Sequence, residues 1–63
     1  MRNYYLIGED QSLIKDKEGR WEFQSRAYAQ FLRDSIKGSK IFSFSGPARL
    51  KERFPDLEIP KSV

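Results

Sequence analysis

RAYAQFLRDSIK, which occupies residues 26–37, has the apolar spacing of an amphipathic α-helix. On a helical wheel its apolar side chains gather on one half, and they are Ala27, Tyr28, Phe31, Leu32 and Ile36. Ser25 comes just before this stretch and can accept a hydrogen bond from a first-turn amide. Gly38 comes just after it and suits a left-handed helix stop. The sequence therefore predicts a helix at about residues 26–37 that packs on a sheet with this apolar half.

The preceding residues have the pattern of β-strands. Residues 3–7, NYYLI, are rich in aromatic and aliphatic side chains and end at a turn cluster, which predicts a strand. Residues 12–24 are predicted to form a β-hairpin, because Gly19 can supply the positive φ of a tight reversal. The alternation of the last five of these residues places Trp21 and Phe23 on one face, which we expect to meet the helix.

The following residues predict a further strand and a second helix. Residues 40–45, KIFSFS, alternate so that Phe42 and Phe44 share a face. A short helix is predicted at about residues 47–53, since the stretch begins with proline, which is favoured at a first helical position. The tail at residues 56–63 is expected to add an edge strand.

These elements give the order β-β-β-α-β-α over one compact domain of residues 1–63. The fold class is α+β, with a small antiparallel sheet packed against the amphipathic helix. The element order, together with Trp21, is similar to that of small three-stranded DNA-binding domains such as the arm-binding domains of phage integrases; no motif of that family is matched. We expect four aromatic residues in the core: Trp21, Phe23, Phe31 and Phe42.

The composition argues against catalysis and against a metal centre. The chain has no histidine and no cysteine, so the commonest general base, the best nucleophile and the usual zinc ligands are missing. Asp16, Glu18 and Glu22 surround a predicted turn with cations between them, which favours a solvated turn over an acid–base pair. We expect a non-catalytic protein without cofactor or metal. No apolar run reaches the length of a membrane span, and the first residues lack the core of a signal peptide, so we expect a cytoplasmic protein.

Positive charge is the best functional signal. The net charge is +3, and it is uneven, because residues 26–63 carry eight cations against four carboxylates. Arg26, Gln30, Arg33 and Lys37 fall within about 60° of one another on the helical wheel, opposite the apolar half. The leading hypothesis is a small regulator that binds nucleic acid through six residues: Arg26, Arg33, Lys37, Lys40, Arg49 and Arg53.

A second hypothesis starts from the need of any amphipathic helix for a polar outer face. The chain is then a protein-binding module or inhibitor that docks on an acidic surface of a larger partner. Neighbours on a strand point to opposite faces, so one of Tyr4 and Tyr5 is expected to face outward as a partner contact. The small size is typical of phage and mobile-element accessory proteins. Self-association stays open in both hypotheses.

Overall fold

The computed structural model describes residues 2–59, which form two strands and two helices. Their order is β1 (Asn3–Ile7), α1 (Arg26–Ser35), β2 (Lys40–Phe44) and α2 (Pro47–Arg53). β1 and β2 pair antiparallel, with Tyr5 opposite Phe42 at the centre of the register. The α+β class is confirmed. The predicted β-β-β-α-β-α order is not, because the sheet described by residues 2–59 has two strands.

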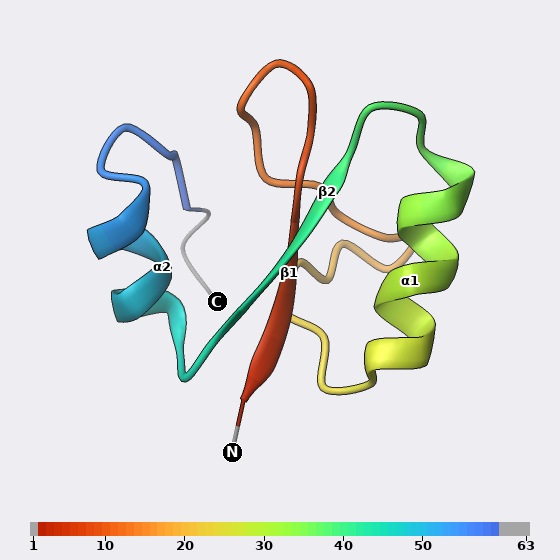
Figure 1. Cartoon of the computed structure of the whole chain (residues 1–63), viewed down its shortest axis with the longest axis horizontal. Coiled ribbons are helices and arrows are strands. Elements are labelled where there is room, and N and C mark those ends of the chain that lie inside the picture. The colour runs from red at the N-terminus through yellow and green to blue at the C-terminus, as the bar shows by residue number, and fades with distance from the viewer. Residues whose placement is uncertain (1, 60–63) are drawn as a thin grey trace.

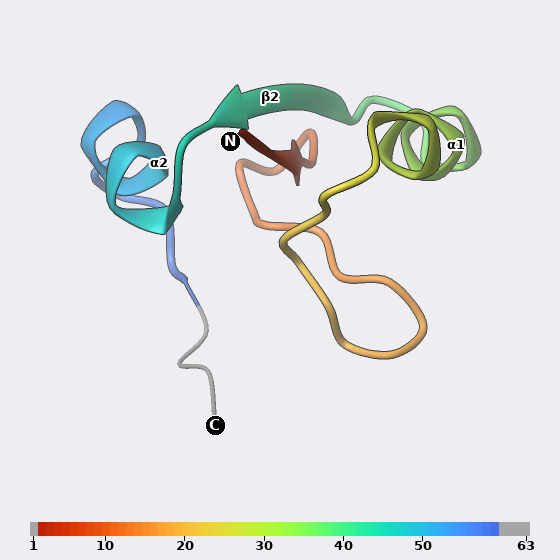
Figure 2. The ribbon, with the colours of Figure 1, turned by 90° about the horizontal axis from the view of Figure 1, so that it is seen from below.

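Both faces of this narrow sheet are covered. The sheet lies between α1 and α2, as Figures 1 and 2 show. On the α2 side, one core cluster consists of Tyr5, Ile7, Leu50 and Leu57; on the α1 side, a second consists of Leu6, Phe23 and Ala29. Successive β1 residues therefore serve different clusters, as strand alternation requires. The sheet packs against α1 as predicted, and the short second helix, which the sequence assigns to neither face, covers the other face.

The ends of the helices follow their local sequence signals. The Ser25 hydroxyl accepts a hydrogen bond from the Tyr28 amide at 3.3 Å, so the predicted N-cap is confirmed. Pro47 opens α2 as predicted. α1 ends at Ser35, two residues before the predicted end, and Gly38 takes a φ of +84° in the turn that leads to β2. A side chain there would be strained, and its Cβ would lie 2.9 Å from a carboxylate oxygen of Glu9.

The predicted hairpin at residues 12–24 does not form. The two ends of this segment pair with β1 instead of with each other, through isolated bridges from Leu13 to Ile7 and from Phe23 to Tyr4. Only the reversal between them matches the prediction, since Gly19 has a φ of +81°. The segment thus passes along the edge of β1 that β2 leaves free.

Trp21 and Phe23 lie on opposite sides of the sheet, although their spacing predicts one face. Phe23 is buried in the α1-side cluster, whereas Trp21 is half-buried and stacks on Tyr5 on the α2 side, with ring centroids 6.1 Å apart. Only Phe23 is bridged to β1, so the chain between the two residues is free of strand geometry. The sequence predicts that Trp21 anchors the sheet against α1, and this prediction is wrong.

α1 is rotated about its axis relative to the predicted orientation. Ala29 is fully buried against the sheet, whereas Phe31 is 65% exposed and Tyr28 is 42% exposed. The prediction of Phe31 as a core residue is wrong. A small side chain at Ala29 lets the helix approach Leu6 closely, and Phe23 supplies the large ring on this side of the sheet.

The C-terminal segment adds core contacts without becoming a strand. Leu57 is buried with Leu50, and residues 57–59 have no strand pairing. The rest of the predicted edge strand, residues 60–63, lies outside the described residues. Within residues 2–59 neither helix combines the length and apolar character that crossing a bilayer requires.

Candidate functional site

β2 has one open backbone edge. Successive residues of an antiparallel strand direct their N–H and C=O groups to opposite edges. Tyr4 exchanges both backbone hydrogen bonds with Phe23, at 2.7 and 3.0 Å, on the edge of β1 that faces away from β2. Tyr4 is opposite Ser43 in the register, so the backbone groups of Ser43 and Ile41 point away from β1. Figure 1 looks onto this edge, with β2 in front of β1.

The outward backbone groups of β2 have few hydrogen-bond partners within residues 2–59. Among the described residues, the single hydrogen bond to them is a long one of 3.4 Å, from Arg2 Nη1 to the carbonyl oxygen of Ser43. The Ser43 hydroxyl is also shielded from solvent without a hydrogen-bond partner in this part of the chain. Natural edge strands are usually blunted by proline, bulges or charge, and β2 carries only Lys40 at its start. The strand is therefore able to accept a further strand.

The basic stripe of α1 lies beside this edge. Tyr28 fixes the opposite flank of the helix, because its hydroxyl donates to Asp16 Oδ2 at 3.0 Å and its ring meets Phe23 edge-on at 5.6 Å. Arg26 and Arg33 are about half a turn around the helix from Tyr28. They consequently lie on the flank toward β2, away from the 12–24 segment, which Figure 2 shows on the far side of the sheet.

Two of the three cations of α2, Arg49 and Arg53, are directed toward the same edge. Lys51 marks the flank that faces the C-terminal segment, because its Nζ donates to the carbonyl oxygen of Leu57 at 2.6 Å. Arg49 and Arg53 are about 160° around the helix from Lys51. The Arg53 guanidinium lies 5.6 Å from the centroid of the Phe54 ring, which packs on β2 through Phe42 at 5.0 Å.

By this helical geometry the arginines of both helices are directed toward the open edge, and Lys40 lies on β2 itself, so we group the six cations named from the sequence together. Arg53 also borders a hollow with Asp56 and Leu57 of the C-terminal segment. We call Arg26, Arg33, Lys37, Lys40, Arg49 and Arg53 the cationic face. Lys37 lies past the end of α1, in the turn before β2, so it belongs to the face but not to a helical stripe. Arg33 and Arg49 contact exposed carboxylates, Asp34 at 3.4 Å and Glu52 at 3.1 Å. Such exposed pairs hold little energy and leave both arginines able to exchange partners.

Charge is divided between the two sides of the molecule. With Arg2, the cationic group has seven members, and the carboxylates of Glu9, Asp34 and Glu52 belong to the same helices or lie beside the turn before β2. The remaining described residues hold four cations and six carboxylates, most of them in the 12–24 segment and the C-terminal segment. An anionic partner would therefore be oriented toward the open edge.

The two tyrosines named as partner contacts are both packed inside the fold. Tyr5 is fully buried, and its hydroxyl donates to Glu22 Oε2 at 2.7 Å. Burial and this hydrogen bond raise the pKa of the Tyr5 hydroxyl well above its ordinary value. Tyr4 is half-buried against the α1-side cluster. The expectation that one of them faces outward is wrong, because each face of the sheet carries a helix.

The turn carboxylates have structural roles. Asp16 Oδ1 accepts hydrogen bonds from the amides of Glu18 and Arg20, both at 2.9 Å. Desolvation raises the pKa of the Asp16 carboxyl. The hydrogen bonds from the Arg20 amide, the Tyr28 hydroxyl and the Glu18 amide together lower this pKa by more than desolvation raises it, so it lies below its ordinary value of 3.8. Asp16 therefore holds the reversal together and attaches it to α1.

Replacing Asp16 by asparagine is expected to lower the melting temperature at neutral pH. A carboxyl whose pKa is depressed by folding contributes stability above its unfolded pKa, and this stability is lost as the pH falls through the folded value. The difference between parent and Asp16→Asn should thus narrow below about pH 4. Thermal unfolding followed by circular dichroism across this range measures it, with Asp34→Asn as the exposed control. A difference that is constant with pH would contradict the role of the charge.

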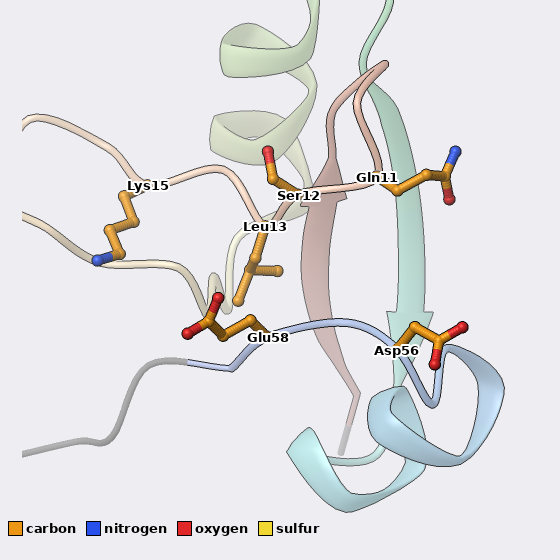
Figure 3. Close-up of a pocket in the computed structure, with 6 residues that line it drawn as sticks. All are labelled: Gln11, Ser12, Leu13, Lys15, Asp56 and Glu58. Carbon is orange, nitrogen blue, oxygen red and sulfur yellow. The ribbon is translucent and has the colours of Figure 1, made fainter.

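A hollow beside the C-terminal segment does not gather reactive groups. It measures about 480 Å³ and lies between the 11–15 segment and the C-terminal segment. Figure 3 shows that Asp56 and Glu58 point away from each other along this hollow, while Lys15 lies at its far end. Residues 2–59 contain no group of three acidic side chains placed to hold a metal ion. The hollow offers no paired carboxylates for proton transfer.

Ile41 and Ser43 are the site residues that the sequence does not reveal. Alternation predicts the strand, but whether its outer edge is paired depends on the topology of the whole chain. The cationic residues, by contrast, are visible in the sequence as spaced charges. Comparison with protein-family models, curated proteins and solved structures finds no match to this chain, so its function has to follow from the cationic face and the open edge.

Proposed function

We propose that this chain is a non-catalytic binding module that docks on an acidic surface of a protein partner. The observation that supports the proposal is the position of the cationic face, which flanks the open edge of β2 from both helices. Flanking cations attract and orient an acidic surface. An open strand edge adds directional backbone hydrogen bonds, for which another polypeptide has the matching spacing.

Nucleic acid is the second candidate, favoured by the spread of the cations over two helices and the turn before β2. Phosphate contacts require such distributed charge, whereas a protein interface is built around a desolvated centre. One observation favours the protein partner. The face surrounds the outward backbone groups of Ile41 and Ser43, which within residues 2–59 receive a single long hydrogen bond, and an acidic protein segment can pair with these groups.

Affinity capture with and without nuclease tests the proposal. The bait is the tagged chain, compared with Arg26→Glu/Lys40→Glu on the cationic face and with Lys15→Glu/Lys17→Glu in the 12–24 segment as a control of equal charge change. We expect one or two proteins in fixed ratio that resist nuclease. They should be lost with the first variant and retained with the second.

Two other results would contradict a protein partner. Capture of many basic and ribosomal proteins that nuclease removes indicates nucleic acid; direct binding to an oligonucleotide should then weaken with salt with a log–log slope of about −3 to −5 for some five cations. Equal capture by the parent and by Arg26→Glu/Lys40→Glu excludes the cationic face from any interface.

A further inference from the structure

We propose that the partner contributes an extended acidic segment that adds to β2 as a third strand of the sheet. This inference rests on the proposed protein-docking function and specifies its mode and the chemistry of the partner segment. The outward N–H and C=O groups of Ile41 and Ser43 provide two adjacent pairing positions, about 7 Å apart along the strand. A segment of about five residues is enough to pair with the length of β2.

The helices on both sides of the sheet determine which side chains such a segment carries. Residues of an added strand alternate between the two faces, as those of β2 do. Those on one face point toward the flank of α1 with Arg26 and Arg33, and those on the other point toward the flank of α2 with Arg49 and Arg53. Glutamate or aspartate can therefore meet an arginine from either face. The expected segment is acidic on both faces, unlike an ordinary amphipathic strand.

Ser43 provides an additional polar contact at the same place. Its side chain lies on the α1 side, because Ser43 is opposite Tyr4 in the register. Its hydroxyl has no hydrogen-bond partner among residues 2–59 and is shielded from water, which is costly for a hydroxyl group. Because water does not reach this hydroxyl, it can donate to a carboxylate of the added strand only after the Ser43 side chain rotates toward the edge. The backbone N–H groups of the edge need no such change.

A second copy of the chain fits this edge less well than an acidic segment. Antiparallel pairing of β2 with its copy would place Ile41 opposite Ser43, a register that the backbone allows. It would also bring two cationic faces together. In this register Lys40 is opposite Phe44 of the other copy, so the repulsion acts between the two faces as a whole and not between paired residues. Charge complementarity therefore selects an acidic partner strand.

A blocked nine-residue peptide with two glutamates on each face, separated by valine and threonine, is a suitable probe. It is titrated at low salt into the ¹⁵N-labelled chain, in parallel with a peptide in which lysine replaces every glutamate. We expect amide shifts and slowed hydrogen exchange centred on Ile41 and Ser43 with the acidic peptide. The lysine peptide should bind at least about tenfold more weakly, since its charge has the wrong sign.

A backbone substitution separates strand addition from simple charge attraction. Chemical synthesis can replace the Ser43 amide by an ester, which removes the outward N–H and leaves the side chains intact. Loss of one hydrogen bond should weaken the acidic peptide about three- to tenfold. An ester at the Ala27 amide, in the first turn of α1 where an amide lacks a helical partner, should change binding less than twofold. Melting temperatures of both esters check the fold.

Three outcomes would overturn the inference. They are equal binding of the two peptides, shifts confined to arginine side chains with Ile41 and Ser43 unaffected, and a dimer in sedimentation whose β2 amides are already protected without peptide. Its failure is distinguishable from failure of the proposed function. If the probe leaves β2 unaffected while a nuclease-resistant partner is still captured through the cationic face, strand addition is wrong and protein docking stands.

Discussion

Tyr5→Ala is expected to leave the chain largely unfolded. The Tyr5 ring is fully buried at the centre of β1, 6.1 Å from the ring of Trp21 and 6.2 Å from that of Phe44. Removing a buried aromatic side chain costs about 3–5 kcal/mol. A single core in a chain of this size supplies roughly the same free energy of unfolding, about 3–5 kcal/mol. Far-UV circular dichroism and urea denaturation of the variant measure the loss.

Tyr5→Phe is the matched control, because it keeps the ring and removes only the hydrogen bond to Glu22. Since Glu22 is exposed, its carboxylate can bind water instead, and the cost should be about 0.5–1.5 kcal/mol. This variant should fold. If Tyr5→Ala instead unfolds at the same urea concentration as the parent chain, β1 is not the buried central strand.

Phe23→Ala is expected to destabilise the chain almost as much, whereas Phe31→Ala should have little effect. Phe23 is 3% exposed and is the largest buried side chain of the α1-side cluster, so its removal should cost about 3–5 kcal/mol. Phe31 is 65% exposed, and a surface substitution typically changes stability by less than about 0.5 kcal/mol. Urea denaturation of the two variants side by side gives the comparison.

This pair of variants tests the rotation of α1 directly. The helical wheel places Phe31 within the apolar half and Ala29 beyond its edge, whereas the structure buries Ala29 and leaves Phe31 exposed. Equal losses of stability from Phe23→Ala and Phe31→Ala would show that α1 packs with the half that the wheel predicts. A further variant, Ala29→Leu, should destabilise the chain in the rotated packing, because a close helix–sheet contact has no room for the larger side chain.

The four regular elements could be predicted because their signals are local. A cap at Ser25, a proline at Pro47 and the alternation of residues 3–7 and 40–45 depend only on near neighbours. Each bound lies within two residues of the expected one. Local chemistry of this kind is independent of how the elements are later assembled.

Packing partners could not be predicted, because aromatic side chains compete for a few interior positions. Nine aromatic residues are available, and only Tyr5 and Phe23 among them are buried. Phe31 has the right spacing for the core, but the Phe23 ring and the close approach of Ala29 leave it outside. In the same way, Trp21 and Phe23 alternate like neighbours on a strand, yet they fill different sides of the sheet. Such outcomes are decided by the volume of the whole core.

The candidate site was predictable in its charges and not in its geometry. The spaced arginines of the two helices are visible in the sequence. The direction in which they point is known only from the structure, because the hydrogen bonds of Tyr28 and Lys51 fix the opposite flank of each helix. The open edge of β2 could not be predicted from local sequence either, because it depends on residues 12–24 not forming the predicted hairpin. Had that hairpin formed as predicted, its strands would have been available to extend the sheet.

The double coverage of β1 has a consequence for the order of folding. β1 comes first in the chain, yet its burial depends on Phe23 and Ala29 on one side and on Leu50 and Leu57 on the other. Pairing of Ile7 with Lys40 closes a long loop. The chain therefore loses the entropy of loop closure before it gains most of the free energy of apolar burial. During synthesis the apolar β1 therefore stays unprotected at least until Leu57 has left the ribosome. We expect folding to be slower than that of a helical protein of this length.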